Sequence, residues 1–125
     1  MKKAKVNTHS DELSALVVQG MQEKKAEDIV IIDLTKIKNA IASYFVVCTG
    51  NSDTQINAIA ESVQDEVKKK THDTPWSSEG RTNREWILLD YSDVVVHVFS
   101  KEKRKFYALE DLWGDAKIIE IESNY

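Results

Sequence analysis

Two apolar runs, Trp86 to Tyr91 and Val94 to Phe99, follow one another almost without a gap, and they restrict the fold more than any other feature. Such runs joined by a very short loop are typical of an antiparallel β-hairpin. With Tyr91 and Ser92 as a two-residue loop, the predicted pairs are Asp90 with Asp93, Leu89 with Val94, Leu88 with Val95, Ile87 with Val96 and Trp86 with His97. The chain is therefore built around a hairpin whose two faces differ.

Alternation along the strands assigns the hairpin side chains to two faces. The first face is wholly aliphatic and should lie against helices: Ile87, Leu89, Val94, Val96 and Val98. The second face carries Trp86, Leu88, Val95, His97 and Phe99, with Asp90 and Asp93 at its end. Protein interfaces use such mixtures because tryptophan combines a large contact area with one hydrogen-bond donor. A covered edge of the core is the other interpretation, and the pattern leaves both open.

The first half of the chain supplies helices and two further strands. Leu13, Leu16, Val17 and Met21 form one helical stripe, and Ser10 is the expected cap of a first helix at about 10–24. The runs 29–32 and 44–48 are short and apolar, as in strands buried on both faces. Ser52 and Gln55 have the spacing of a capping box, so a second helix begins there. Its core-facing stripe is Ile56, Ile59, Ala60, Val63 and Val67.

After the hairpin, helical spacing predicts a third helix that packs near it, through Phe106, Leu109, Leu112 and Trp113. Residues 116–121 suit either a last short strand or a tail. The predicted fold class is α/β, a mixed sheet flanked by helices. A chain of 125 residues favours a single domain over 1–125, because two domains would each be undersized.

Composition narrows the expected partners. The net charge of −4 argues against a surface that neutralises phosphates, so direct RNA contact should be minor at most. The lone Cys48 lies inside an apolar run and is interpreted as a small buried hydrophobe in a reducing cytosol. No apolar run approaches the roughly 20 residues that span a bilayer, so we expect a cytoplasmic protein without a membrane partner. An edge strand near 74–79 leaves a homodimer open.

One segment invites a catalytic hypothesis. The turn Gly50-Asn51-Ser52 between a strand and a helix could cradle a phosphate, as in a nucleotide-binding or nucleotidyl-transfer enzyme. However, no Walker lysine and no G-x-G-x-x-G accompany it. Asp90 and Asp93 flank a hairpin turn, whereas two-metal transfer needs a close carboxylate pair. His9, His72 and His97 lack zinc-ligand spacing. We therefore expect no enzyme, no cofactor and no metal, with the nucleotide enzyme as the alternative.

Several segments of the sequence, in this order along the chain, resemble those of one protein family. They are YFVVCTGNS from Tyr44, then Gln55 and Ile59-Ala60, Glu79-Gly80, WILLDYSDVVVHVF from Trp86, and Arg104, Tyr107 and LEDLW. Over about 13–116 they are similar to the ribosomal silencing factors, also called the Iojap-related family. The resemblance implies a mixed α/β domain like the nucleotidyltransferases in topology but without their catalytic carboxylates. Residues 117–125 extend past these blocks.

The resemblance also implies a function. Members of that family bind a ribosomal protein on the subunit-joining face of the large ribosomal subunit and obstruct docking of the small subunit, which represses translation when nutrients are scarce. Organellar relatives assist large-subunit assembly. The matching positions, with Leu88 from the same hairpin face, make the partner-binding candidates Trp86, Leu88, Asp90, Asp93, His97, Tyr107, Leu109 and Glu110.

One residue departs from the family pattern. The family usually has glycine in the hairpin loop where this chain has Ser92. A two-residue type I′ loop needs positive φ there, which costs a serine about 1 kcal/mol. The turn is therefore expected to adopt another type or to carry strain. An even shift of register would leave the assignment of the two faces unchanged.

Overall fold

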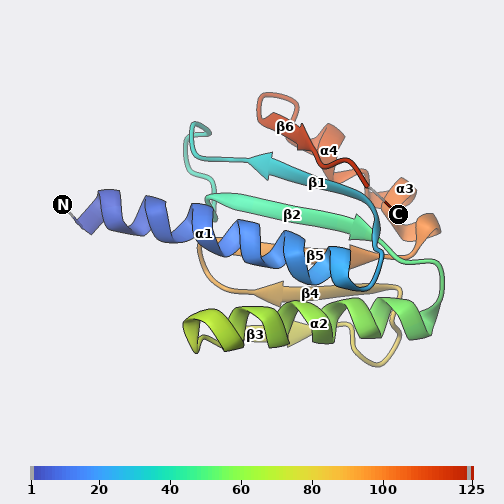
Figure 1. Ribbon diagram of the computed structural model, residues 1–125. Coiled ribbons are helices and arrows are strands. Elements are labelled where there is room, and N and C mark those ends of the chain that lie inside the picture. Colours follow the sequence, from blue (N-terminus) through green and yellow to red (C-terminus); the bar gives the residue numbers. More distant parts are fainter. Residues whose placement is uncertain (1, 124) are drawn as a thin grey trace.

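The computed structural model describes residues 2–123 and 125, and the side chains from residue 10 onward. Its elements are α1 (Lys2–Glu23), β1 (Glu27–Asp33), β2 (Tyr44–Thr49), α2 (Asp53–Thr71), β3 (Ser77–Glu79), β4 (Trp86–Asp90), β5 (Val94–Phe99), α3 (Lys101–Tyr107), α4 (Leu109–Leu112) and β6 (Lys117–Glu120). The strands form one sheet in the order β3-β4-β5-β2-β1-β6 (Figure 1). Strands β2 and β5 are parallel, and the other neighbours are antiparallel. The predicted α/β class with a mixed sheet is confirmed.

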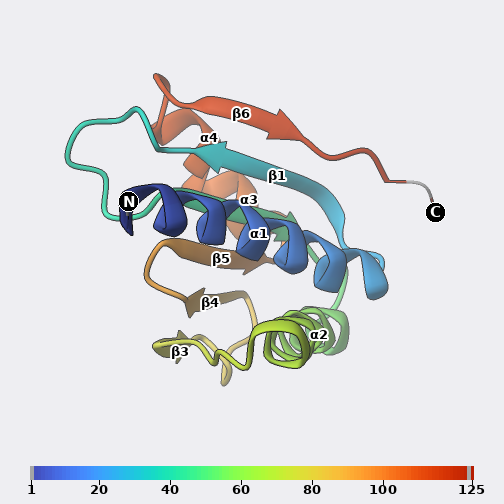
Figure 2. The same ribbon diagram turned by 60° about the vertical axis from the view of Figure 1, so that its left-hand side comes forward.

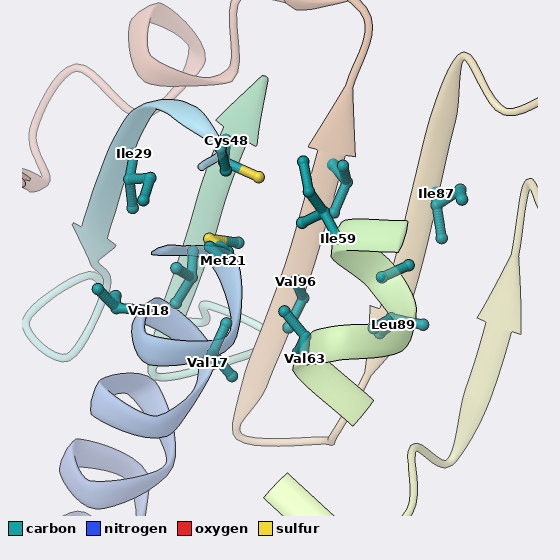
Figure 3. Packing of buried hydrophobic residues seen from close by; sticks show 14 of the residues in the cluster. Val17, Val18, Met21, Ile29, Cys48, Ile59, Val63, Ile87, Leu89 and Val96 are labelled. Atoms are coloured by element: carbon teal, nitrogen blue, oxygen red, sulfur yellow. The ribbon is translucent and has the colours of Figure 1, made fainter. Parts of the chain in front are cut away.

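Helices α1 and α2 lie side by side over one face of the sheet (Figures 1 and 2). The aliphatic hairpin face packs under them, as predicted, together with the five apolar positions expected on α2. Figure 3 shows Val17 and Met21 of α1 and Ile59 and Val63 of α2 pointing at the strands, near Val96. Cys48 is buried in the same cluster. This cluster is the main core of the protein.

The other face of the sheet is covered less completely. The apolar cluster on this face includes Val30, Phe45, Val95 and Phe99 of the strands and Leu109 of α4. The segment 34–42 between β1 and β2 contributes buried Leu34 and Ala42. Trp86 and Leu88 remain only half-buried at its border. The second face of the hairpin is thus partly buried in the core and partly accessible. It has features of both interpretations, the covered edge of the core and the accessible surface that an interface needs.

The start of α2 follows its sequence signal. The Ser52 side chain accepts a hydrogen bond from the Gln55 N–H at 3.1 Å, which confirms the predicted cap. The Gln55 side chain accepts from the Asn51 N–H at 2.6 Å and donates to the Lys24 carbonyl at 3.0 Å. One glutamine therefore fixes the turn before α2 and ties it to the chain that leaves α1.

The prediction for the first helix was wrong at its N-terminus. Helix α1 begins at Lys2, well before Ser10, so Ser10 cannot be its cap. Ser10 instead lies inside the helix and is buried, as is Ser14 one turn later. Serine is a favoured N-cap residue, so Ser10 was predicted to start the helix. A serine inside a helix looks the same in the sequence, so the residue type could not distinguish the two cases.

The predicted hairpin register was wrong by two residues. The observed partners are Trp86 with Phe99, Ile87 with Val98, Leu88 with His97, Leu89 with Val96 and Asp90 with Val95. The Tyr91 N–H donates to the Val94 carbonyl at 2.9 Å, so the turn residues are Ser92 and Asp93 rather than Tyr91 and Ser92, and Ser92 has a φ of +78°. The Ser92 N–H donates to the Asp90 carboxylate at 2.7 Å. Because the shift is even, both faces keep their predicted members.

The predicted third helix is two short helices. Ala108 adopts a φ of +43° and separates α3 from α4, so the stripe of four apolar residues does not face the core as one unit. Leu109 is buried and Trp113 half-buried, whereas Phe106 and Leu112 are exposed. Residues 117–120 form β6, an edge strand paired with β1. At the opposite edge β3 is the predicted edge strand, and the homodimer stays a prediction.

Candidate functional site

An aromatic cluster joins the hairpin to α3. The Trp86 ring stacks on Phe99 with centroids 5.0 Å apart and contacts Tyr107 of α3 at 4.5 Å. Phe106 packs edge-on against Tyr107 at 5.0 Å. Strand β4 and helix α3 are adjacent here because the Ser100 N–H donates to the Glu85 carbonyl at 2.8 Å. The structure therefore brings together Trp86 and Tyr107, two of the predicted partner-binding residues.

His97 holds the tryptophan of this cluster. Its Nδ1 accepts a hydrogen bond from the Trp86 indole Nε1–H at 3.0 Å, so the ring proton of neutral His97 is on Nε2. Within the described residues, Nε2 is buried without a hydrogen-bond partner. Burial lowers the pKa of His97 to about 4, so the imidazole is neutral near pH 7. With 3% of its surface exposed, His97 can serve a partner only by orienting Trp86.

Arg104 anchors α3 and α4 to the sheet. Its guanidinium donates two hydrogen bonds to Glu110, at 3.1 and 2.7 Å, and a third to the Thr49 hydroxyl at the end of β2, at 2.9 Å. Burial raises the pKa of Glu110, but the hydrogen bonds and charge of Arg104 outweigh that effect and keep it below its ordinary value. Glu110 is thus an ionised tether, although the sequence suggested it as a partner contact.

The most exposed apolar groups of this region are residues that the sequence analysis assigned to a helix core. Phe106 is 76% exposed and Leu112 69%, while Tyr107 is 40% exposed. We define Trp86, Phe106 and Tyr107, which are linked by ring contacts, as the aromatic surface. The helical spacing of Phe106 and Leu112 suggested burial, and the break at Ala108 between α3 and α4 had no sequence signal. Large exposed apolar groups of this kind mark protein interfaces.

Asp90 and Asp93 lie away from the aromatic surface. They flank the turn at the far end of β4, four residues from Trp86, which is roughly 13 Å along a strand. The Asp90 carboxylate accepts from the Ser92 N–H, and the Asp93 carbonyl accepts from the Ser43 and Tyr44 N–H groups, at 2.7 and 3.1 Å. These contacts give both aspartates a role in shaping the turn. Leu88 lies between the two ends of the strand, and Leu109, the first residue of α4, is buried.

An acidic cavity lies where β1 and β6 meet Arg104 and Glu110. A cavity of about 400 Å³ is lined by Asp28, Arg104, Glu110 and Glu120, together with apolar residues of β1. Its one cationic group, Arg104, is already hydrogen-bonded to Glu110. Such a lining repels phosphate oxygens rather than attracting them. None of Gly50, Asn51 and Ser52 lines this cavity; in the turn itself, the Asn51 side chain donates to the Glu27 carboxylate at 2.8 Å and the Ser52 hydroxyl accepts from the Gln55 N–H.

Within the described residues, no group of three or more His, Cys, Asp or Glu side chains is placed to hold a metal ion. The His9 side chain lies outside the described residues. No helix of the described part of the chain has the length and apolarity needed to cross a bilayer.

The comparisons with known proteins agree with the motif pattern. The model of the family described as "Ribosomal silencing factor during starvation" matches residues 7–125. The chain belongs to the ribosomal silencing factor family. It is 42% identical over 100 residues to "Ribosomal silencing factor RsfS" of Bacillus subtilis, which covers 80% of this chain and 83% of the relative. A solved structure of protein CV0518 from Chromobacterium violaceum has a TM-score of 0.78 at 38% identity, covering 83% of this chain and 85% of that one.

A more distant relative is similar over most of this silencing-factor domain. A mouse protein named "Mitochondrial assembly of ribosomal large subunit protein 1" is 27% identical over 100 residues, which is 78% of this chain and 43% of the mouse protein. The family match also runs through residues 117–125, beyond the blocks recognised in the sequence. That segment contains β6, which completes the sheet beside β1. The aromatic surface and Arg104 lie within the matched region.

Proposed function

We propose that this protein represses translation by binding a protein of the large ribosomal subunit on its subunit-joining face, where it blocks docking of the small subunit. The observation that carries the proposal is the aromatic surface, an accessible group of three rings in a member of the ribosomal silencing factor family. The name of the mouse relative supports a partner on the large subunit. The action is steric and requires no catalysis, cofactor or membrane, and it takes place in the cytoplasm.

Preorganisation makes Trp86 a suitable anchor for a protein partner. Its indole is hydrogen-bonded to His97 and packed against both Phe99 and Tyr107 before any partner arrives. A side chain that is already oriented loses little conformational freedom on binding. Tryptophan and tyrosine are also enriched among the residues that dominate interface energies. Phe106 adds apolar area beside them that water now covers.

Charge favours a protein partner over RNA. The net charge of −4 would repel the phosphate backbone at long range, whereas it would speed encounter with a basic ribosomal protein. The charge next to the aromatic surface is mixed: Lys103 of α3 lies over the Phe106 ring at 5.8 Å, Glu110 is paired with Arg104, and Asp111 lies in the first turn of α4. Asp90 and Asp93 at the hairpin turn carry negative charge at the far end of β4. We include them, with Leu88, in the proposed contact region.

Co-sedimentation with isolated large subunits, followed by a subunit-joining assay, tests this proposal. The parent protein should co-sediment and lower the yield of joined ribosomes. Trp86→Ala should weaken binding about thirtyfold, the effect of truncating a central interface tryptophan. Because Trp86 is half-buried, Phe106→Ala provides a second variant whose fold should be intact, and it should weaken binding several-fold. Lys69→Ala, at a side chain 69% exposed on α2 and across the sheet from the aromatic surface, is the control.

Two results would contradict the proposal. One is a parent protein that neither co-sediments with large subunits nor inhibits joining. The other is normal binding by both Trp86→Ala and Phe106→Ala, which would move the contact elsewhere on the domain. The nucleotide-enzyme alternative has its own measurement, since saturating nucleotide with Mg²⁺ would raise the melting temperature of a nucleotide-binding protein. We expect no rise with any nucleotide, because the Asn51 and Ser52 side chains are already hydrogen-bonded to Glu27 and Gln55.

A further inference from the structure

Helices α3 and α4 cover the second face of the sheet with few buried side chains. Figure 2 shows both helices behind the strands, on the opposite side from α1. Both lie within the described chain, and Leu109 of α4 is the one residue that they bury. Leu112 at the end of α4 is 69% exposed. Segments with few buried apolar contacts are those that open locally while the rest of a protein stays folded.

The observed position of α4 has two unfavourable features. Ala108, at the junction of the two helices, has a φ of +43°, which is costly for a residue with a Cβ atom. The indole Nε1–H of Trp113, the residue that ends α4, is shielded from water and has no hydrogen-bond partner among the described residues. A shielded donor without a partner is unfavourable compared with a hydrated one. Movement of α4 away from the sheet would hydrate this donor and relax Ala108.

The hydrogen bonds of Arg104 oppose that movement. Its Nε and Nη2 donate to Oε2 of Glu110 in α4, and its Nη1 donates to the Thr49 hydroxyl at the end of β2. Because Arg104 belongs to α3, one side chain joins α3, α4 and the sheet. The Trp113 ring also packs edge-on against Phe45 of β2, with centroids 6.0 Å apart. The main contacts that hold α4 are therefore one buried leucine, one ring contact and one guanidinium.

The same guanidinium positions the aromatic surface. Phe106 and Tyr107 follow Arg104 in α3, and the Tyr107 ring contacts Trp86 at 4.5 Å. If Glu110 moves away with α4, Arg104 loses two of its three hydrogen bonds, and α3 loses its side-chain link to α4. Two of the three rings of the aromatic surface belong to α3, so their placement depends on whether α4 is closed.

We propose that residues 109–113 form a latch that opens as a unit while the sheet stays folded, and that Arg104 is the positioning residue that keeps the latch closed and the aromatic surface assembled. The consequence for binding, which rests on the proposed function, is that only the closed form docks on the large subunit. The apparent affinity is then that of the closed form multiplied by the closed fraction.

Hydrogen exchange of the indole N–H groups, followed by nuclear magnetic resonance, tests the latch in the free protein. The chain has three tryptophans. Trp76 is 81% exposed and Trp86 is hydrogen-bonded to His97, so they serve as the unprotected and protected references. The Trp113 indole is shielded without a hydrogen bond to a described residue, so its exchange reports the opening of α4. We expect low concentrations of urea to leave this exchange nearly unchanged, whereas the core N–H of Val63 exchanges only through global unfolding.

Three variants should change the opening in different ways. Glu110→Gln removes the charge that holds Arg104 and should speed Trp113 exchange about tenfold, because hydrogen bonds between charged groups are the stronger ones. Asp111→Asn is the matched control, since it removes a charge from the same turn of α4 but leaves the Arg104–Glu110 pair in place, and it should not change the exchange rate. Ala108→Gly adopts positive φ freely and should slow the exchange about fivefold.

Binding kinetics distinguish the latch from a contact. On immobilised large subunits, Arg104→Met should lower the association rate constant about fivefold and leave the dissociation rate constant nearly unchanged, because fewer molecules are closed. Phe106→Ala removes a contact and should instead raise the dissociation rate constant. Adding Ala108→Gly to Arg104→Met should restore part of the association rate, which would not happen if Arg104 were a partner contact.

Four results would overturn the inference. They are Trp113 exchange that rises with urea in parallel with that of Val63, equal exchange rates in Glu110→Gln and Asp111→Asn, no slowing in Ala108→Gly, or an Arg104→Met variant that associates at the parental rate. The first three are measured without ribosomes. A parent protein that does not bind large subunits would therefore contradict the proposed function alone, since the exchange measurements still decide whether the latch exists.

Discussion

Trp86 and His97 are diagonal neighbours on adjacent strands, with the indole Nε1–H donating to the imidazole Nδ1 at 3.0 Å. The backbone partner of Trp86 is Phe99, and that of His97 is Leu88. The hydrogen bond fixes the tautomer of His97 and the orientation of the indole at the same time. The position of the aromatic surface thus depends on a neutral, buried histidine.

Protonation of His97 should make the stability of the protein depend on pH. Burial lowers the folded-state pKa from 6.5 to about 4, so between these values the unfolded chain binds the proton more readily. The free energy of unfolding should therefore fall as the pH drops from 6.5 to 4, by up to about 3 kcal/mol from this residue. Urea unfolding at a series of pH values measures the slope.

Two variants attribute that slope to His97. His97→Asn keeps an acceptor for the indole but cannot titrate, so its stability should depend less on pH in this range. His72→Asn is the matched control, because His72 is exposed at the left-handed C-cap of α2, where asparagine is well tolerated. A pH dependence that survives unchanged in His97→Asn would contradict the assignment.

Ser92 should be replaceable by glycine with a gain in stability. Its φ of +78° is costly for a residue with a Cβ atom, whereas glycine adopts it freely. We expect Ser92→Gly to raise the free energy of unfolding by about 1 kcal/mol, measured by urea titration. Ser78→Gly in β3, where no positive φ occurs, should give no gain. Equal effects in the two variants would show that the turn conformation is not the cause.

Gly20 should not tolerate alanine, because α1 and α2 are closest there. A Cβ atom at Gly20 would lie 2.6 Å from Cα of Val63, a backbone atom that cannot give way. The Ser62 hydroxyl also donates to the Gly20 carbonyl at 2.8 Å, which holds the helices together. We expect Gly20→Ala to destabilise by about 2 kcal/mol. Gly114→Ala, whose nearest contact would be an ordinary 3.8 Å, should be nearly neutral in the same melting measurement.

Arg104 and Glu110 should be energetically coupled. The pair, in which Arg104 Nε and Nη2 both donate to Oε2 of Glu110, is mostly shielded, with 13% and 30% of the two side chains exposed, and Arg104 also reaches Thr49. A double-mutant cycle with Arg104→Met and Glu110→Gln should give a coupling of about 1–2 kcal/mol. Because the pKa of Glu110 is lowered, this stabilisation should be present near pH 7 and be lost as acid protonates the carboxylate. A coupling near zero would mean that the pair does not anchor α4.

Local patterns predicted several elements correctly. Three features were predicted from neighbouring residues alone. The Ser52 cap and the apolar stripe of α2 depend on residues a helical turn apart, and the aliphatic face of the hairpin depends on strand alternation. The candidate site was predicted in part, because the structure joins Trp86 to Tyr107. The structure does not bring Asp90 and Asp93 close to Trp86 and Tyr107. Strand alternation predicts which face a side chain is on, but it does not predict how far apart two side chains of that face lie along the strand.

The sequence by itself determined the element types, the mixed α/β class and the similarity to the ribosomal silencing factors, because periodicity, caps and motif order are properties of neighbouring residues. The tertiary structure alone decided the hairpin register, which requires a turn with Ser92 at positive φ and a parallel partner in β2. It also decided which aromatic rings face water. The bend at Ala108 exposes Phe106 while Leu109 is buried, and that choice depends on the sheet and Arg104, which are distant in the chain.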